Sequence, residues 1–122
     1  MKIIFDFDHT LFDMMAMHAA IEQAMTELGI PLTVYQDAYT RVTNWKAFTG
    51  TALAHQLART AKVKEADVVE ALDRVVKDSA KWLYPDVVDG LLKLSESGNE
   101  LFLLTWGDME WQMKKIKHCE IM

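Results

Sequence analysis

The 122-residue chain has one cysteine, two prolines and no apolar run near the roughly 20 residues that a membrane-spanning helix needs. Cys119 has no second cysteine to pair with, which excludes an internal disulfide and favours a reducing compartment. The cysteine and the four histidines of the chain are too scattered in sequence to form a structural zinc site. No basic and apolar leader precedes the first apolar segment. We therefore expect a cytoplasmic protein without a membrane anchor.

Positive charge is scarce as well. The formal net charge is −5, and a nucleic-acid-binding protein usually has a basic stripe. The one basic cluster is Lys114, Lys115 and Lys117, late in a segment that opens with Asp108 and Glu110. Acids first and bases last complement a helix dipole, so we interpret the lysines as a solvated helix end. No nucleic-acid partner is expected.

Apolar residues make up 51% of the chain, which is enough for the core of one small domain. Two short apolar runs rich in β-formers predict buried strands, and stretches with apolar residues every three or four positions predict helices. Thr33 to Gln36 has the form of a capping box, which would open one of these helices. The predicted strands are 2–7 and 100–105, and the predicted helices are 14–28, 33–45, 51–61, 68–83, 87–97 and 109–118.

Two strands separated by helices favour an α/β fold with a parallel sheet and a right-handed crossover. Residues 14–83 have the pattern of a small helical bundle inserted between the strands. A parallel sheet of two strands leaves both edges open and buries little surface. The sequence therefore predicts either further strands outside this chain or a partner that covers the edges.

Polar side chains follow both predicted strands. Asp6, Asp8 and Thr10 come at the end of the first, and Thr105 ends the second. Sites in open α/β sheets form at the carboxyl ends of strands, so we expect these groups to converge. An alternative is that Asp8 or Thr10 only caps the following turn, while Asp13 and Asp108 are helix N-caps.

These residue types suit phosphoryl transfer. A carboxylate can attack an anionic phosphoester when a divalent cation neutralises the site, and a second acid can protonate the leaving group. Asp6 and Asp8, spaced by two, can point to one side of an extended strand. Thr105, with the backbone amides of Trp106 and Gly107, can donate hydrogen bonds to phosphoryl oxygens.

The segment Asp6-Phe7-Asp8-His9-Thr10 resembles the first motif of the haloacid-dehalogenase-like superfamily, Asp-x-Asp-x-Thr after an apolar strand. The run ending at Thr105 is similar to its second motif, and the helical segment is similar to the cap that one subgroup inserts after the first motif. The resemblance implies a Rossmann-like parallel-sheet core, residues 1–13 and 84–122, with a helical cap, residues 14–83.

The resemblance also implies roles. Asp6 would be the nucleophile that forms an aspartyl-phosphate, and Asp8 the general acid and then the base. Asp6 and the backbone carbonyl of Asp8 would bind Mg²⁺, while Thr105, Trp106 and Gly107 would hold the phosphoryl group. An acid at position 8 favours phosphoester over carbon–halogen chemistry. The substrate would be a small phosphorylated metabolite.

The family's third motif, a lysine, and its fourth, an acidic pair, are not matched in this chain. Lys114 and Lys115 come too soon after Thr105 to match the third. The chain therefore resembles the first half of a longer enzyme. Besides a phosphatase, two alternatives stand: a catalytically incomplete fragment or interaction module that needs a partner chain or a C-terminal half, and a phosphosugar mutase of the same family.

Overall fold

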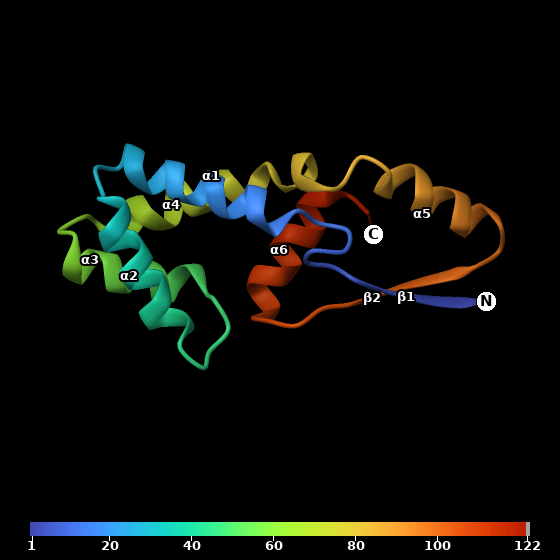
Figure 1. Cartoon of the computed structure of the whole chain (residues 1–122), viewed down its shortest axis with the longest axis horizontal. Coiled ribbons are helices and arrows are strands. Elements are labelled where there is room, and N and C mark those ends of the chain that lie inside the picture. The colour runs from blue at the N-terminus through green and yellow to red at the C-terminus, as the bar shows by residue number, and fades with distance from the viewer. Residues whose placement is uncertain (122) are drawn as a thin grey trace.

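A computed structural model describes residues 1–121, and it folds into two strands and a set of helices (Figure 1). The order of the elements is strand, four helices, a short 3₁₀ turn, helix, strand and helix. Their bounds are β1 Lys2–Asp6, α1 Met14–Glu27, α2 Leu32–Thr43, α3 Gly50–Thr60, α4 Glu65–Lys77, η1 Ser79–Trp82, α5 Val87–Glu96, β2 Glu100–Leu104 and α6 Met109–Cys119.

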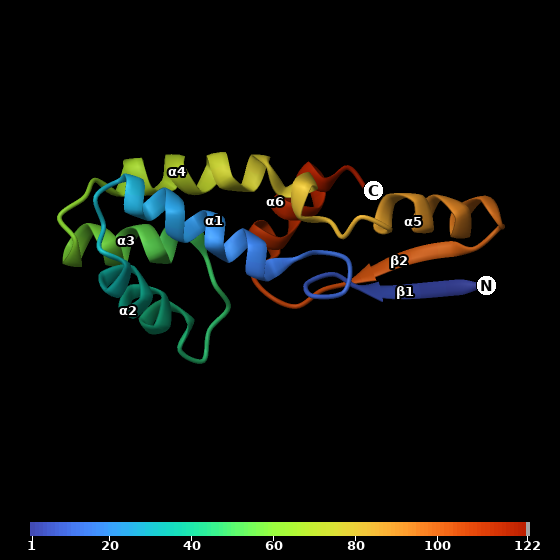
Figure 2. The same cartoon turned by 45° about the horizontal axis from the view of Figure 1, so that its top comes forward.

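The two strands pair in parallel, as predicted. The register runs from Lys2 opposite Glu100 to Asp6 opposite Leu104. All of α1 to α5 lies between the strands in sequence, and Figure 2 shows α5 alongside β1 and β2. Because the strands are parallel and in register, Asp6 and the loop that follows Leu104 lie together at the carboxyl ends of the two strands.

The sheet is covered unevenly. Phe5 and Leu103, partners in the register, are half-buried. Alternate residues point to opposite faces of a strand, and the other face carries Ile4, Phe102 and Leu104, all exposed. Helix α5 buries only Val87 of its own side chains. This face of the sheet is therefore uncovered, and its apolar side chains lie beside charged ones.

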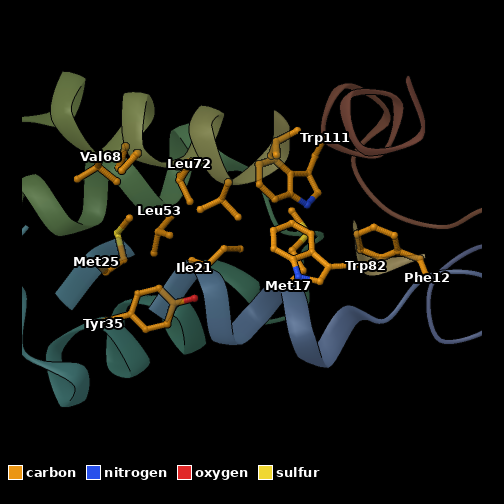
Figure 3. Close-up of a cluster of buried hydrophobic side chains, with 14 of the residues drawn as sticks. Phe12, Met17, Ile21, Met25, Tyr35, Leu53, Val68, Leu72, Trp82 and Trp111 are labelled. Atoms are coloured by element: carbon orange, nitrogen blue, oxygen red, sulfur yellow. The ribbon is translucent and has the colours of Figure 1, made fainter. Parts of the chain in front are cut away.

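The main core lies in the helical bundle, not against the sheet. Helix α1 buries Met17, Ile21 and Met25, which recur every four residues and so line one stripe. Figure 3 shows this stripe facing Leu53 of α3 and Leu72 of α4. Most of the buried apolar side chains of the described residues lie in this bundle.

Helix ends follow the predicted caps in two of three places. The carboxylate of Asp13 accepts a hydrogen bond from the amide of Ala16, and that of Asp108 accepts one from Trp111. The capping box at Thr33 is wrong: α2 begins at Leu32 after Pro31, so Thr33 already lies within the first turn. Proline fixes φ near the value that a helix start requires, which places the start there without a side-chain cap.

Helix α6 joins the two parts of the molecule. It contacts α4 and η1 and lies between the bundle and the sheet (Figure 1). The division into a core of 1–13 and 84–122 and a cap of 14–83 stays a prediction, and residue 122 lies outside the described residues. Among residues 1–121, no helix is long and apolar enough to cross a membrane.

Candidate active site

The loop after β1 is held by its own backbone. The carbonyl of Phe7 accepts hydrogen bonds from the amides of Leu11 and Phe12, at 2.9 and 3.1 Å. His9 adopts a left-handed conformation with φ of 64°, and its amide donates to the Phe12 carbonyl. The rings of Phe7 and Phe12 stack with centroids 4.9 Å apart and are fully buried. These two buried rings fix the position of Asp8, which lies between Phe7 and His9 in the sequence.

Asp6, at the end of β1, is exposed. One of its oxygens, Oδ2, accepts a hydrogen bond from the hydroxyl of Thr10 at 3.3 Å. The loop therefore brings the third polar residue of the motif back onto the first. An exposed carboxylate with a single hydrogen-bond partner is open to attack a substrate or to bind a cation.

Asp8 is held much more firmly. Its Oδ1 accepts from Lys115 Nζ at 2.9 Å, and its Oδ2 accepts from Gln112 Nε2 at 2.9 Å. The same Gln112 nitrogen lies 2.6 Å from Thr105 Oγ1. Since Thr105 Oγ1 accepts this bond, the hydroxyl proton of Thr105 remains available to donate. One side chain of α6 thus ties the end of β1 to the residue that follows β2.

The interpretation of the three lysines as a solvated helix end is wrong for Lys115, which is buried. Its exposed fraction is 1%, and its ammonium lies 3.3 Å from Met14 Sδ and above the rings of Phe7 and Phe12. Burial lowers the pKa of Lys115, and the hydrogen bond and charge of Asp8 oppose that shift. Lys114 does lie at the surface, where it pairs with Asp73 and Glu110. Because successive residues of a helix point in different directions, Lys115 lies in the interior and its neighbour Lys114 lies at the surface.

The loop after Thr105 depends on glycine. Gly107 has a φ of 134°, and a Cβ there would lie 3.3 Å from Gln112 Cγ. A larger residue would be strained and would press on Gln112. Trp106 is 80% exposed. The structure therefore places Trp106 and Gly107 beside Thr105 and Gln112, with no protein partner for their amides in the described hydrogen bonds.

A cavity of about 320 Å³ adjoins Asp8 and lies between α6, α1 and α2. Its wall is mixed: aromatic rings, an imidazole and the side chains of two lysines lie beside aliphatic side chains. Burial lowers the pKa of His18 in this wall, and the charge of Lys115 adds to the shift. The residues that line the cavity are Asp8, Met14, His18, Ile21, Tyr39, Thr43, Lys46, Phe48, Trp106, Gly107, Asp108, Trp111, Gln112 and Lys115.

Oxygen donors for a hard cation are present but few. Asp6 offers an exposed carboxylate, and Asp8, two residues further on, offers a backbone carbonyl. Mg²⁺ prefers oxygen ligands and keeps several waters. Within residues 1–121, no three His, Cys, Asp or Glu side chains gather closely enough to form a metal site. The residues fit Mg²⁺ as a partial site that leaves most positions to water or substrate.

The structure thus brings Asp8 and Thr105 together through Gln112, and Asp6 together with Thr10. Gln112 and Lys115 were missed from the sequence. The signal for them is their spacing: they share the buried side of α6 with Trp111, Ile116 and Cys119. Polar residues in an apolar stripe need partners, and here the partner is Asp8.

Comparison with known proteins agrees with this architecture. The family model for haloacid dehalogenase-like hydrolases matches residues 3–122. No curated protein matches the sequence. Among solved structures, the HAD-hydrolase YfnB from Bacillus subtilis, bound to magnesium, is similar with a TM-score of 0.61 and 18% identity over 99% of this chain and 60% of its own.

Two further structures are similar in fold. CbbY from Rhodobacter sphaeroides gives a TM-score of 0.53 with 20% identity, covering 97% of this chain and 54% of its own. L-2-haloacid dehalogenase from Xanthobacter autotrophicus gives 0.51 with 19% identity, covering 99% and 52%. The chain spans a little over half the length of these relatives. The family match over nearly all residues, on an α/β fold with a parallel sheet, shows that the chain belongs to the haloacid dehalogenase-like hydrolases.

Proposed function

We propose that this chain carries the nucleophile half of a Mg²⁺-dependent phosphatase-type hydrolase that acts on a small phosphorylated metabolite. The observation that carries the proposal is the arrangement at the carboxyl ends of the strands. There Asp6 is exposed, while Asp8 and Thr105 are linked by Gln112. The nearby cavity of about 320 Å³ suits a small organic group.

In the proposed reaction, Asp8 enters as the protonated carboxylic acid; Asp6 attacks the phosphorus, and Asp8 gives its proton to the leaving oxygen and becomes a carboxylate. Asp8 then accepts a proton from the water that hydrolyses the aspartyl-phosphate. The hydroxyl of Thr105 and the backbone amides of Trp106 and Gly107 donate hydrogen bonds to the phosphoryl oxygens. Mg²⁺, held by Asp6 and the carbonyl of Asp8, would offset the negative charge that the phosphate brings.

The relatives support phosphoester chemistry without settling it. CbbY was determined with phosphate and, as a mutant, with xylulose-1,5-bisphosphate, whereas the Xanthobacter enzyme was determined with chloropropionic acid covalently bound. The proposal favours the first chemistry for this chain because Asp8 supplies an acid for an oxygen leaving group, which a halide does not need.

The test is phosphate release from an aryl phosphate with and without Mg²⁺. Asp6→Asn should remove activity, and Asp8→Asn should lower kcat by about 10²- to 10⁴-fold, the usual contribution of a general acid. Asp86→Asn, an exposed acid at the start of α5, is the matched control and should leave activity unchanged. Equal rates in the native chain and Asp6→Asn would refute the proposal. Tests on phosphosugars would separate a phosphatase from a mutase.

A second candidate, an interaction module, is favoured by the bare side of the sheet. A groove of about 660 Å³ runs along β2 and α6, with Phe102, Leu104, Met109 and Met113 among its apolar lining residues. Open strand edges and exposed apolar faces are typical of surfaces that bind another chain. We propose that the partner is a polypeptide that adds strands beside β2. Concentration-dependent self-association that Leu104→Lys abolishes would support this role; a monomer at all concentrations would argue against self-association through this face.

A further inference from the structure

Lys115 has no role in the reaction proposed above, although it forms a buried ion pair with Asp8, the proposed general acid and base. Lys115 reaches Asp8 across the interface between α6 and the loop after β1, and its side chain is almost fully excluded from water. A buried ammonium is costly unless it is paired, and Asp8 is its only ion-pair partner among the described residues. Burying Lys115 costs desolvation free energy, and the group that receives its charge is the carboxylate of Asp8.

The environment of Lys115 restricts it to one orientation. The rings of Phe7 and Phe12 lie 5.6 and 5.4 Å from the ammonium, measured to their centroids, and Met14 Sδ lies on another side. These groups come from the loop and from α1, while Lys115 comes from α6. Two segments therefore fix the ammonium, which is carried by a third, and the ammonium in turn holds one oxygen of Asp8.

Gln112 fixes the other oxygen. With Oδ1 on Lys115 and Oδ2 on Gln112, the carboxyl plane of Asp8 has little freedom to rotate. Asp6, by contrast, accepts one side-chain hydrogen bond among residues 1–121, from the exposed hydroxyl of Thr10. The two carboxylates of the motif therefore differ in how they are hydrogen-bonded, and the two donors to Asp8 both come from α6.

We propose that Lys115 is a positioning residue for the reaction, which holds Asp8 beside the cavity and places a positive charge next to a site that must accept an anionic phosphate. The catalytic part of this inference rests on the proposed function. The contact itself does not depend on that function. Lys115 acts through Asp8 and does not touch the phosphate.

The test combines turnover with a double-mutant cycle. Lys115→Met keeps the length of the side chain without the charge, Lys115→Arg keeps the charge, and Lys114→Met is the matched control on the exposed side of the same helix. For an aryl phosphate, Lys115→Met should lower kcat at least about tenfold while KM changes less than about threefold, since the lost effect lies on the general acid. Lys115→Arg should recover part of kcat, and Lys114→Met should match the native chain.

The cycle uses Asp8→Asn, Lys115→Met and the double variant, with urea unfolding as the readout. Coupling of at least about threefold in the unfolding equilibrium constant is expected for residues in direct contact. Additive effects, or a native kcat in Lys115→Met, would overturn the inference. If the native chain does not turn over substrate, the proposed function fails and the cycle alone decides whether Lys115 holds Asp8. Lys115→Gln replaces Lys115→Met in both assays if the latter does not fold.

Discussion

The side-chain amide of Gln112 donates a 2.9 Å hydrogen bond to Asp8 Oδ2, although the two residues lie 104 positions apart. The same nitrogen reaches Thr105, so a single residue of α6 connects the ends of both strands. A sheet of two strands is a weak scaffold by itself. The position of Asp8 therefore depends on the packing of α6 as much as on β1.

Replacing Gln112 with methionine, which has a similar shape, should remove both hydrogen bonds. We expect Gln112→Met to lower the free energy of unfolding by about 1–2 kcal/mol, because Asp8 Oδ2 and Thr105 Oγ1 then lose the donor that they share. Gln23→Met removes an exposed glutamine on α1 and should change stability by less than about 0.5 kcal/mol. Urea unfolding of both variants checks this, and equal stabilities would show that the Gln112 bonds contribute nothing.

Two methionines of α1 test where the core lies. Met17 is fully buried in the bundle, whereas Met15 is 73% exposed on the same helix. Met17→Ala leaves a cavity and should cost about 2–5 kcal/mol of unfolding free energy, while Met15→Ala should cost less than about 0.5 kcal/mol. Thermal and urea unfolding measure both. A small loss in Met17→Ala would mean that the bundle is loosely packed.

His18 should make stability depend on pH. Burial first, and then the charge of Lys115, lowers the pKa of His18 below its ordinary value of about 6.5. The unfolded chain therefore binds a proton at a pH where the folded chain does not, and stability should fall as the pH drops below about 6.5.

We expect His18→Gln to unfold with a smaller loss of stability between pH 7.5 and pH 5.5 than the native chain does. The control is His55→Gln, because the side chain of His55 is 65% exposed on α3. Urea unfolding at the two pH values gives the comparison. A native-like pH dependence in His18→Gln would show that other groups cause it.

Much of the backbone follows from local signals. Residues close in sequence set the two strands, predicted at 2–7 and 100–105 and observed at Lys2–Asp6 and Glu100–Leu104. They also set the helical stripe of Met17 and Ile21 and the caps at Asp13 and Asp108. These features were predicted correctly because their physics is local. The start of α2 was not, because Pro31 decides it in place of the side chain of Thr33.

The contacts around Asp8 could not be predicted in the same way. Lys114 and Lys115 are neighbours with the same charge, and only the rotation of α6 decides which one is buried. That rotation depends on the packing of α6 against α4 and η1, which are distant in sequence. The acids of the motif were recognisable from the pattern, whereas the residues that hold them depend on tertiary structure.

The central claim is that Asp6 is a nucleophile, and the most direct measurement is mass spectrometry of the chain after incubation with acetyl phosphate and Mg²⁺. We predict a phosphoryl group on the peptide that contains Asp6, in larger amount in Asp8→Asn because that variant lacks the base for hydrolysis. Asp6→Asn should carry none. If neither the native chain nor Asp8→Asn gains a phosphoryl group, or if the group lies on another residue, the proposed role of Asp6 is wrong.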